Sequence, residues 1–216
     1  MESKILFEDG ELVVCLKPAG LLSETGGMPE MLQNDLGGTF FCVHRLDRAA
    51  GGVMVYARTK RAAAELSAQI AAGGMRKEYL AVVQGVPPEP KGSFCDLLFH
   101  DAARNKSFVV TRPRRGVREA KLDYELLGTV EREGERLSAL RITLLTGRSH
   151  QIRVQFASRS LPLVGDARYG SRIRGCDLAL WSAALRFAHP SDGRELSFSA
   201  PPPAYFPWTQ FSLHNT

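Results

Sequence analysis

The sequence predicts an α+β fold with a mixed, largely antiparallel sheet and flanking helices and loops. Most apolar segments are short β-prone runs, several of them alternating apolar and polar residues, whereas only two segments keep helical spacing. The 216 residues are 44% hydrophobic and 24% charged, a balance that gives one compact domain a sizeable core. We therefore expect residues 1–216 to form a single domain, and a disordered or fibrous chain is excluded.

The first part of the chain predicts a polar loop between two buried strands. A β-prone run over Glu11–Leu16 stops at Lys17-Pro18-Ala19-Gly20, and a loop follows to about Gly27. Short apolar strands are expected over Phe40–Val43 and Val53–Tyr56, with the polar sequence His44-Arg45-Leu46-Asp47-Arg48 between them. Such loops often carry catalytic groups, because the flanking strands hold them rigidly.

Two helices are expected. Thr59 is a favourable N-cap for the first, whose apolar spacing continues to Gly73-Gly74. The second covers Ser149–Arg159, with Ser149 as its N-cap and two apolar residues four apart on its buried face. Further strands are expected over residues 78–83, 107–111, 120–127, 137–145, 179–187 and 195–199.

The sequence favours cofactor-free chemistry in the cytoplasm. No run approaches the roughly 20 apolar residues that span a bilayer, and the first residues lack a basic segment followed by an apolar one. The four cysteines form no Cys-x-x-Cys pair and are expected to be buried and reduced. The histidines show no metal-ligand spacing. Neither a Gly-x-Gly-x-x-Gly pattern nor a phosphate-binding loop is present, so no metal or nucleotide cofactor is expected.

The charge distribution favours a nucleic-acid partner. The formal net charge is +5 and the pI about 9.2. Between Ala102 and Arg118 there are six basic residues and no acidic one. From Arg148 to Arg174, six arginines accompany the single acid Asp166. Two long segments of one sign indicate RNA or DNA, although a solvated basic loop is the usual alternative. The basic residues of the first segment are Arg104, Lys106, Arg112, Arg114, Arg115 and Arg118.

Asp47 is the first candidate for chemistry. It is bracketed by Arg45 and Arg48, whose positive charges favour the ionised carboxylate. An ionised carboxylate suits a nucleophile or a base, whereas a general acid needs a raised pKa. The alternative is a loop ion pair of small energetic worth.

Two further candidates carry basic and aromatic side chains. Arg148, His150 and Arg153 lie at the start of the second predicted helix, where free backbone N–H groups and the helix dipole favour a phosphate. Arg153 can instead face inward and hold a buried carboxylate such as Asp47, and a solvated basic helix start is the third possibility. Tyr79, at the beginning of a strand, is either ordinary sheet core or a stacking platform for a base removed from its helix.

Several segments together resemble the RluA-type pseudouridine synthases. HRLDRAAGGVMVYART, RKEYLAVVQG, TGRSHQIRVQFA and LPLVGDARYG occur in the order and approximate spacing of that family, and LVVCLKPAGLL resembles its lead-in. The resemblance covers essentially the whole chain. It implies the family's catalytic fold with a central active-site cleft, no cofactor or metal, and isomerisation of uridine in tRNA or rRNA to pseudouridine. We expect a monomer that acts without a membrane.

The resemblance also implies roles for individual residues. Asp47 matches the catalytic aspartate, which either attacks the sugar or helps to remove the C2′ proton. Arg153 matches the basic residue that pairs with this aspartate. Tyr79 matches the aromatic residue that stacks on the target base and assists proton removal at C5. Arg45 matches an arginine that fills the space left by the flipped nucleotide. Together with Arg48, Arg148, His150, Arg112, Arg114 and Arg115, Arg45 makes up the expected RNA-binding set.

The chain departs from the family pattern at three places. Ala50-Gly51-Gly52 stands where Thr-Ser-Gly is common, Gln155 where a histidine is usual, and Trp181-Ser182 where a His-Ala pair is usual. The catalytic segments begin close to residue 1, so we expect no S4-like module and expect RNA recognition to rest on the domain itself. Two rival functions stay open: an RNA-binding or ribosome-assembly factor that has lost turnover, and a nucleoside-processing enzyme for small molecules.

Overall fold

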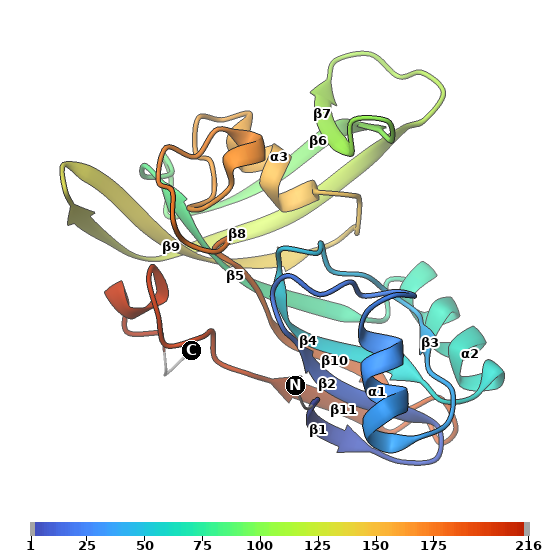
Figure 1. Ribbon diagram of the computed structural model, residues 1–216. Helices are drawn as coiled ribbons and strands as arrows, with labels where there is room; N and C mark the ends of the chain where they lie inside the picture. The colour runs from blue at the N-terminus through green and yellow to red at the C-terminus, as the bar shows by residue number, and fades with distance from the viewer. Residues whose placement is uncertain (1–2, 214–216) are drawn as a thin grey trace. The chain divides into compact units, whose positions relative to one another are not determined.

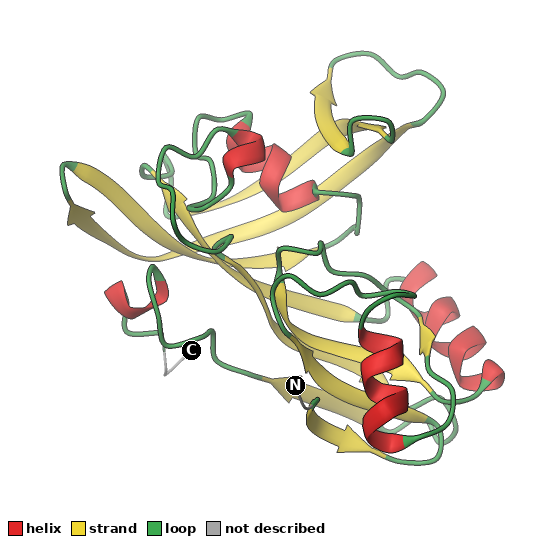
Figure 2. Ribbon diagram, viewed as in Figure 1, coloured by secondary structure: helices red, strands yellow, loops and turns green. Residues whose placement is uncertain are grey.

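The computed structural model describes residues 3–213, and the chain divides into two compact units (Figures 1 and 2). The first unit comprises Met1–Lys77 and Trp181–Ala200. The second comprises Glu78–Leu180 and Pro201–Thr216. The larger segment of the second unit is therefore inserted between the two segments of the first, and its smaller segment follows them.

The first unit is built on a mixed sheet. Its strands follow the order β1-β2-β4-β10-β11, and the short β3 pairs with β4. β4 and β10 run parallel, whereas the other pairs are antiparallel. The strands are β1 Lys4–Glu8, β2 Leu12–Lys17, β3 Phe41–Cys42, β4 Gly51–Ala57, β10 Leu180–Ala188 and β11 Glu195–Ser199.

Two helices belong to the first unit, α1 Met28–Leu36 and α2 Lys60–Ala71. The hydroxyl of Thr59 accepts a hydrogen bond from the Ala62 amide at 3.0 Å, so the expected N-cap of α2 is confirmed. Leu66 of α2 lies in a buried cluster with residues of β2, β4 and β10. This helix therefore covers one face of the sheet.

The second unit combines a strongly twisted antiparallel sheet with one helix (Figure 1). Its strand order is β5-β9-β8-β6-β7. The helix α3 Gln151–Ala157 packs on this sheet through Phe156, whose ring centroid lies 5.0 Å from Phe94 and 5.7 Å from Tyr124. The elements are β5 Arg76–Gln84, β6 Lys91–Asp101, β7 Lys106–Val110, β8 Val117–Arg132, β9 Glu135–Leu144, and the 3-10 turns η1 Ala167–Tyr169 and η2 Trp208–Gln210.

The predicted fold class is confirmed, and three elements were not expected from the sequence. α1, β1 and β6 were missed. α1 follows a glycine pair and has Pro29 as its second residue, and the Glu30 carboxylate accepts hydrogen bonds from the Gly26 and Gly27 amides at 2.8 and 3.0 Å. Proline in the first turn and an acidic residue close behind it are the local signal for this helix.

The second predicted helix begins and ends inside its expected bounds. It covers Gln151–Ala157 rather than Ser149–Arg159, and His150 rather than Ser149 occupies the N-cap, with φ 53° and ψ 25°. No side chain within residues 3–213 caps the first turn of the helix. The Gln151 side-chain oxygen instead accepts from the Arg148 amide at 3.0 Å, which holds the chain that leads into the helix. The expectation of a Ser149 cap was therefore wrong, because the helix starts one residue later and His150 enters it in a left-handed backbone conformation.

The cysteines also differ from expectation. All four are free thiols, but only Cys15 is buried, and Cys95 is exposed. Side chains alternate along a strand, and Phe94 faces α3, so Cys95 points to the opposite side of β6. Within residues 3–213, the helices are all too short or too polar to span a membrane.

Candidate active site

The loop that carries Asp47 joins β3 to β4 in the first unit and is anchored through its backbone. The Ser23 hydroxyl donates to the Leu46 carbonyl at 2.9 Å and accepts from the Leu46 amide at 3.0 Å, and both residues are buried. The Ala50 amide donates to the Asp47 carbonyl at 3.0 Å, which closes a turn around the half-buried Asp47. These bonds fix the position from which the carboxylate projects.

Lys17 supports the same loop and was not identified as a site residue from the sequence. Its side chain is fully buried, and Nζ donates to three carbonyls: Leu21 at 2.7 Å, Pro18 at 2.9 Å and Arg48 at 3.2 Å. Burial lowers the pKa of Lys17 to about 8, while the charge of Asp47 opposes this shift and that of Arg48 adds to it. One buried ammonium group thus ties the end of β2 to the residue after Asp47.

We expect this lysine to make stability depend on pH in the alkaline range. Between about pH 8 and the ordinary value of 10.5, the unfolded chain binds a proton at Lys17 that the folded chain has released. The free energy of unfolding therefore gains a contribution that rises with pH, up to about 3 kcal/mol. Denaturant unfolding of the wild type and of Lys17→Met at pH 7.5 and pH 10 measures this contribution.

Comparison of the two proteins isolates Lys17, because other titrating groups are common to both. The wild type should gain more stability than Lys17→Met between the two pH values. Equal changes in both proteins would show that Lys17 keeps an ordinary pKa in the folded state.

His44, at the start of the loop, has a structural role. It is buried, and its Nε2 accepts a hydrogen bond from the Val55 amide at 3.2 Å. Burial lowers the pKa of His44 well below its ordinary value, and the positive charge of Lys77 lowers it further. The ring is therefore neutral at pH 7, with its proton on Nδ1, and connects the loop to β4.

Two of the departures from the family pattern contact each other. A Cβ placed on Gly51 would lie 2.6 Å from a ring carbon of Trp181 and 3.1 Å from the Lys17 carbonyl oxygen. The Trp181 indole is held by a 2.9 Å hydrogen bond from Nε1 to the Ala200 carbonyl. The large side chain at 181 therefore requires glycine at 51, four residues after Asp47.

We expect Gly51→Ser to destabilise the protein by about 1–3 kcal/mol, because the added atoms overpack a filled site. In the Trp181→His background the smaller ring gives way, and the same change should cost at least about 1 kcal/mol less. Thermal or denaturant unfolding of the two single variants and the double variant measures this coupling. Additive effects would show that the two positions are independent.

The two arginines that flank Asp47 are exposed. Arg45 forms an ion pair with Glu24 at 3.1 Å. Arg48 donates through Nε to the Gly20 carbonyl at 2.8 Å. Both guanidinium groups therefore lie at the surface of the Asp47 loop.

In the second unit, Arg153 faces inward. Its side chain is only 8% exposed and forms a two-point ion pair with Asp166, with Nε to Oδ2 at 2.7 Å and Nη2 to Oδ1 at 2.9 Å. This burial excludes the interpretation of Arg153 as a solvated residue at a basic helix start. Asp166 was not identified as a site residue. It lies in a loop thirteen residues after Arg153, and no sequence pattern indicates that the two side chains pair.

Tyr169 contacts both Arg153 and His150, the N-cap residue of α3. Its ring centroid lies 5.1 Å from the Arg153 guanidinium carbon, and its hydroxyl lies 2.9 Å from His150 Nδ1. The same hydroxyl accepts from the Ser107 amide at 2.7 Å. Burial raises the pKa of Tyr169, so the phenol keeps its proton at neutral pH. Arg153 and His150 are thus brought together by one tyrosine that the sequence did not single out.

The remaining predicted residues divide between core and surface. Tyr79 lies on β5 and is 5% exposed. Arg148 is exposed and donates through Nε to the Glu119 carbonyl at 2.9 Å. Gln155 is fully buried and donates to Asp96 at 2.8 Å and to the Ala120 carbonyl at 3.2 Å, which accounts for an amide at this position.

The basic segment includes β7 and a surface loop between β7 and β8, and the three arginines of the expected RNA-binding set lie in this loop. Arg112, Arg114 and Arg115 are exposed, and none of them forms an ion pair within residues 3–213. The Arg114 guanidinium lies over the Phe99 ring at 4.5 Å from its centroid. Three positive charges without a carboxylate partner suit contacts with phosphates.

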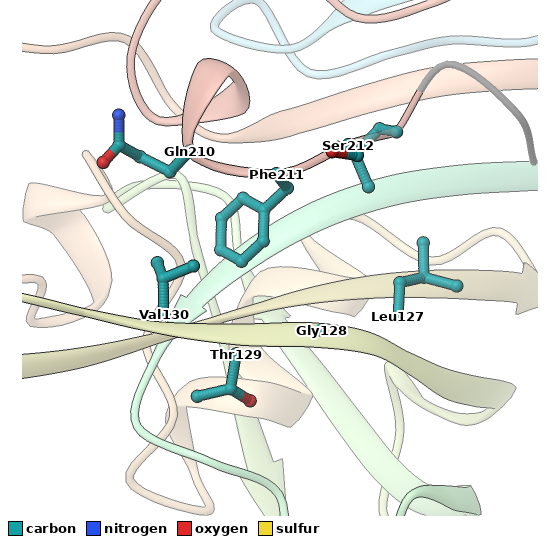
Figure 3. Close-up of a pocket in the computed structure, with 8 residues that line it drawn as sticks. Leu127, Gly128, Thr129, Val130, Gln210, Phe211 and Ser212 are labelled. Atoms are coloured by element: carbon teal, nitrogen blue, oxygen red, sulfur yellow. The ribbon is translucent and has the colours of Figure 1, made fainter.

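A small pocket in the second unit is lined by none of these side chains. It has a volume of about 250 Å³, and Figure 3 shows Phe211 directed toward the strand β8. None of its lining residues is titratable, so it offers no acid–base chemistry. They are Leu127, Gly128, Thr129, Val130, Gln210, Phe211, Ser212 and Leu213. No cluster of three or more His, Cys, Asp or Glu side chains suited to a metal ion occurs within residues 3–213.

Comparisons with known proteins agree with the motifs. The family model described as RNA pseudouridylate synthase matches residues 11–158. The dual-specificity RNA pseudouridine synthase RluA of Escherichia coli strain K12 is 33% identical over 212 residues, covering 91% of this chain and 92% of its own length. The ribosomal large subunit pseudouridine synthase D of Xanthomonas campestris is 35% identical over 92% of this chain and 66% of its own length.

A solved structure has the same fold. Human RNA pseudouridylate synthase domain containing 1 aligns with a TM-score of 0.81 at 22% identity, over 94% of this chain and 85% of the human one. With the family match spanning most of the chain and a relative 33% identical over nearly its whole length, the protein belongs to the RNA pseudouridylate synthase family and is an RluA-type RNA pseudouridine synthase.

Proposed function

We propose that this protein converts specific uridines in structured tRNA or rRNA to pseudouridine, with Asp47 as its essential residue. The placement of Asp47 supports this most directly: a half-buried carboxylate projects from a loop whose neighbouring backbone is held by Ser23 and Lys17. An ionised carboxylate fixed in this way suits attack on the sugar or removal of its C2′ proton.

The proposed reaction needs no cofactor. The bond between N1 of uracil and C1′ of ribose breaks, the detached base turns, and a bond forms between C5 and C1′. The proton on C5 passes to water, and N1 gains a proton, so substrate and product are isomers. A stacked uridine must first leave its helix, at a cost of a few kcal/mol that stacking and phosphate contacts offset.

Roles for the other residues follow from the resemblance and from their surroundings. We propose that Tyr79 stacks on the target base and assists proton removal at C5. Arg153 is the basic residue that the family motif pairs with the catalytic carboxylate. Arg45 fills the space of the flipped nucleotide. The phosphate-binding set comprises Arg48, Arg148, His150, Arg112, Arg114 and Arg115.

We further propose that residues 1–216 act as one catalytic domain, as a cytoplasmic monomer. Each unit consists of two chain segments, and the chain passes between the units three times, so no single cut in a linker separates the two. Gel filtration tests the monomer, which should elute near 23.8 kDa.

Tritium release from RNA labelled at C5 of uridine tests the proposed function. Unmodified tRNA and large-subunit rRNA fragments serve as substrates, at several salt concentrations. We expect release from at least one RNA and a steep fall in RNA affinity as salt rises. Binding without release would favour a factor that has lost turnover, and activity on free nucleosides with little salt dependence would favour a small-molecule enzyme.

A further inference from the structure

The ion pair of Arg153 has a geometry that restricts the guanidinium in its plane. Asp166 contacts Nε and Nη2, at 2.7 and 2.9 Å, and is itself 1% exposed. This side-on contact uses one edge of the guanidinium, so that Nη1 points away from Asp166. Two parallel hydrogen bonds define both the position and the rotation of the group.

Tyr169 restricts the same group through its ring. The central carbon of the Arg153 guanidinium lies over this ring, 5.1 Å from the ring centroid. The ring is held in turn through its hydroxyl, by Ser107 and His150. The Arg153 guanidinium therefore has a carboxylate at one edge and an aromatic ring as a second neighbour, and both come from the segment Gly165–Tyr169.

That segment has little freedom to move. Gly165 has φ +78°, and a Cβ at this position would lie 2.2 Å from the Asp177 carbonyl oxygen, so only glycine fits. The Asp166 amide donates to the Leu163 carbonyl at 3.0 Å, and the Asp166 carbonyl accepts from the Ser171 amide at 3.0 Å. The carboxylate is thus presented from a backbone bonded on both sides.

The burial of this pair needs a reason beyond stability. Removing two charges from water costs several kcal/mol per ion, and an apolar pair of similar volume is often at least as stable. We propose that Asp166 and Tyr169 are positioning residues that fix the orientation of Arg153 for the isomerisation. This inference rests on the proposed function, in which Arg153 is the basic partner of the catalytic carboxylate.

The second unit also contains a matched pair outside the proposed machinery. Arg159 forms a two-point ion pair with Asp96, at 3.0 and 3.1 Å, and lies over the Phe94 ring at 3.8 Å. Arg159 thus has a carboxylate and an aromatic ring as neighbours, as Arg153 does, and it lies six residues after Arg153. Asp96→Asn and Phe94→Leu therefore control for the loss of a carboxylate or a ring beside an arginine.

The test measures chemistry separately from binding and folding. Asp166→Asn keeps the side-chain shape and removes the charge, and Tyr169→Leu removes the ring. Each variant is assayed for its single-turnover rate at saturating enzyme, its Kd for the same C5-tritiated RNA, and its melting temperature. We expect the rate to fall about 100-fold, as for a misplaced group, with Kd within about threefold of the wild type. The two control variants should keep the wild-type rate.

Other outcomes would overturn the inference. A folded Asp166→Asn with the wild-type rate would show that the pair only stabilises the second unit. An equal loss of rate in Asp96→Asn would show that any broken Arg–Asp pair has this effect. If Asp166→Asn does not fold, the rate of folded Tyr169→Leu is compared with that of the wild type instead, and a wild-type rate would overturn the inference. A wild type that forms no pseudouridine in either RNA would instead refute the proposed function, and the inference with it.

Discussion

Asp47→Asn is expected to lower the rate of pseudouridine formation by at least about 10⁴-fold while RNA affinity stays near that of the wild type. The substitution keeps the size of the side chain and removes the charge that either proposed role requires, and loss of one essential catalytic group typically has an effect of this order. The backbone bonds around residue 47, to Ser23 through Leu46 and to Lys17 through Arg48, do not involve the carboxylate. Single-turnover assays with labelled RNA and equilibrium binding measure the two effects separately.

Asp192→Asn is the matched control for this prediction. It makes the same charge change in the same unit, at a side chain that is 51% exposed, and should retain the wild-type rate. If Asp47→Asn kept a tenth or more of the wild-type rate, Asp47 would not be the essential carboxylate.

Replacing Arg112, Arg114 and Arg115 together by Glu is expected to weaken RNA binding by about 100-fold at low salt. All three side chains are exposed and lack a carboxylate partner within residues 3–213, so their charges are available to phosphates. Removing phosphate contacts also makes binding less sensitive to salt, and the slope of log affinity against log salt should become shallower by about 2 to 3. Filter binding over a salt series measures both quantities.

A second triple variant makes the same change in net charge at paired arginines. Arg61, Arg186 and Arg194 lie at the surface and pair with carboxylates at 2.6, 3.9 and 3.5 Å. Their replacement by Glu also takes the formal net charge from +5 to −1. It should weaken RNA binding far less. Equal losses in the two triple variants would mean that total charge, rather than the loop, determines affinity.

The elements that local pattern defines were predicted well. α2 has a hydroxyl N-cap at Thr59, and Ala62 and Leu66 are buried at helical spacing, so its start needs no distant partner. β11 likewise matches its expected range, Glu195–Ser199. β6 was missed because Asp96 interrupts its apolar pattern, and this inward-facing carboxylate is explained only by Arg159, 63 residues later.

Among the site residues too, those defined by a local motif were predicted, and those defined by distant partners were not. The motif around Asp47 is local and was found from the sequence, including the position of the loop between two strands. Lys17 looked like the polar end of a strand, and only the folded chain shows that its ammonium group is buried among three carbonyls. The partnership of Arg153 with Asp166 also depends on how a loop returns to a helix, which no periodicity encodes.

The most direct test of the central claim is a balance of nucleosides in RNA treated with the wild-type protein. The RNA that releases tritium is digested completely, and uridine, pseudouridine and free uracil are quantified by chromatography. An isomerase gives one pseudouridine and one released tritium for each uridine lost, with no free uracil. Free uracil with abasic sites would identify a hydrolase of N-glycosides, and unchanged uridine would show that the protein binds RNA without isomerising it.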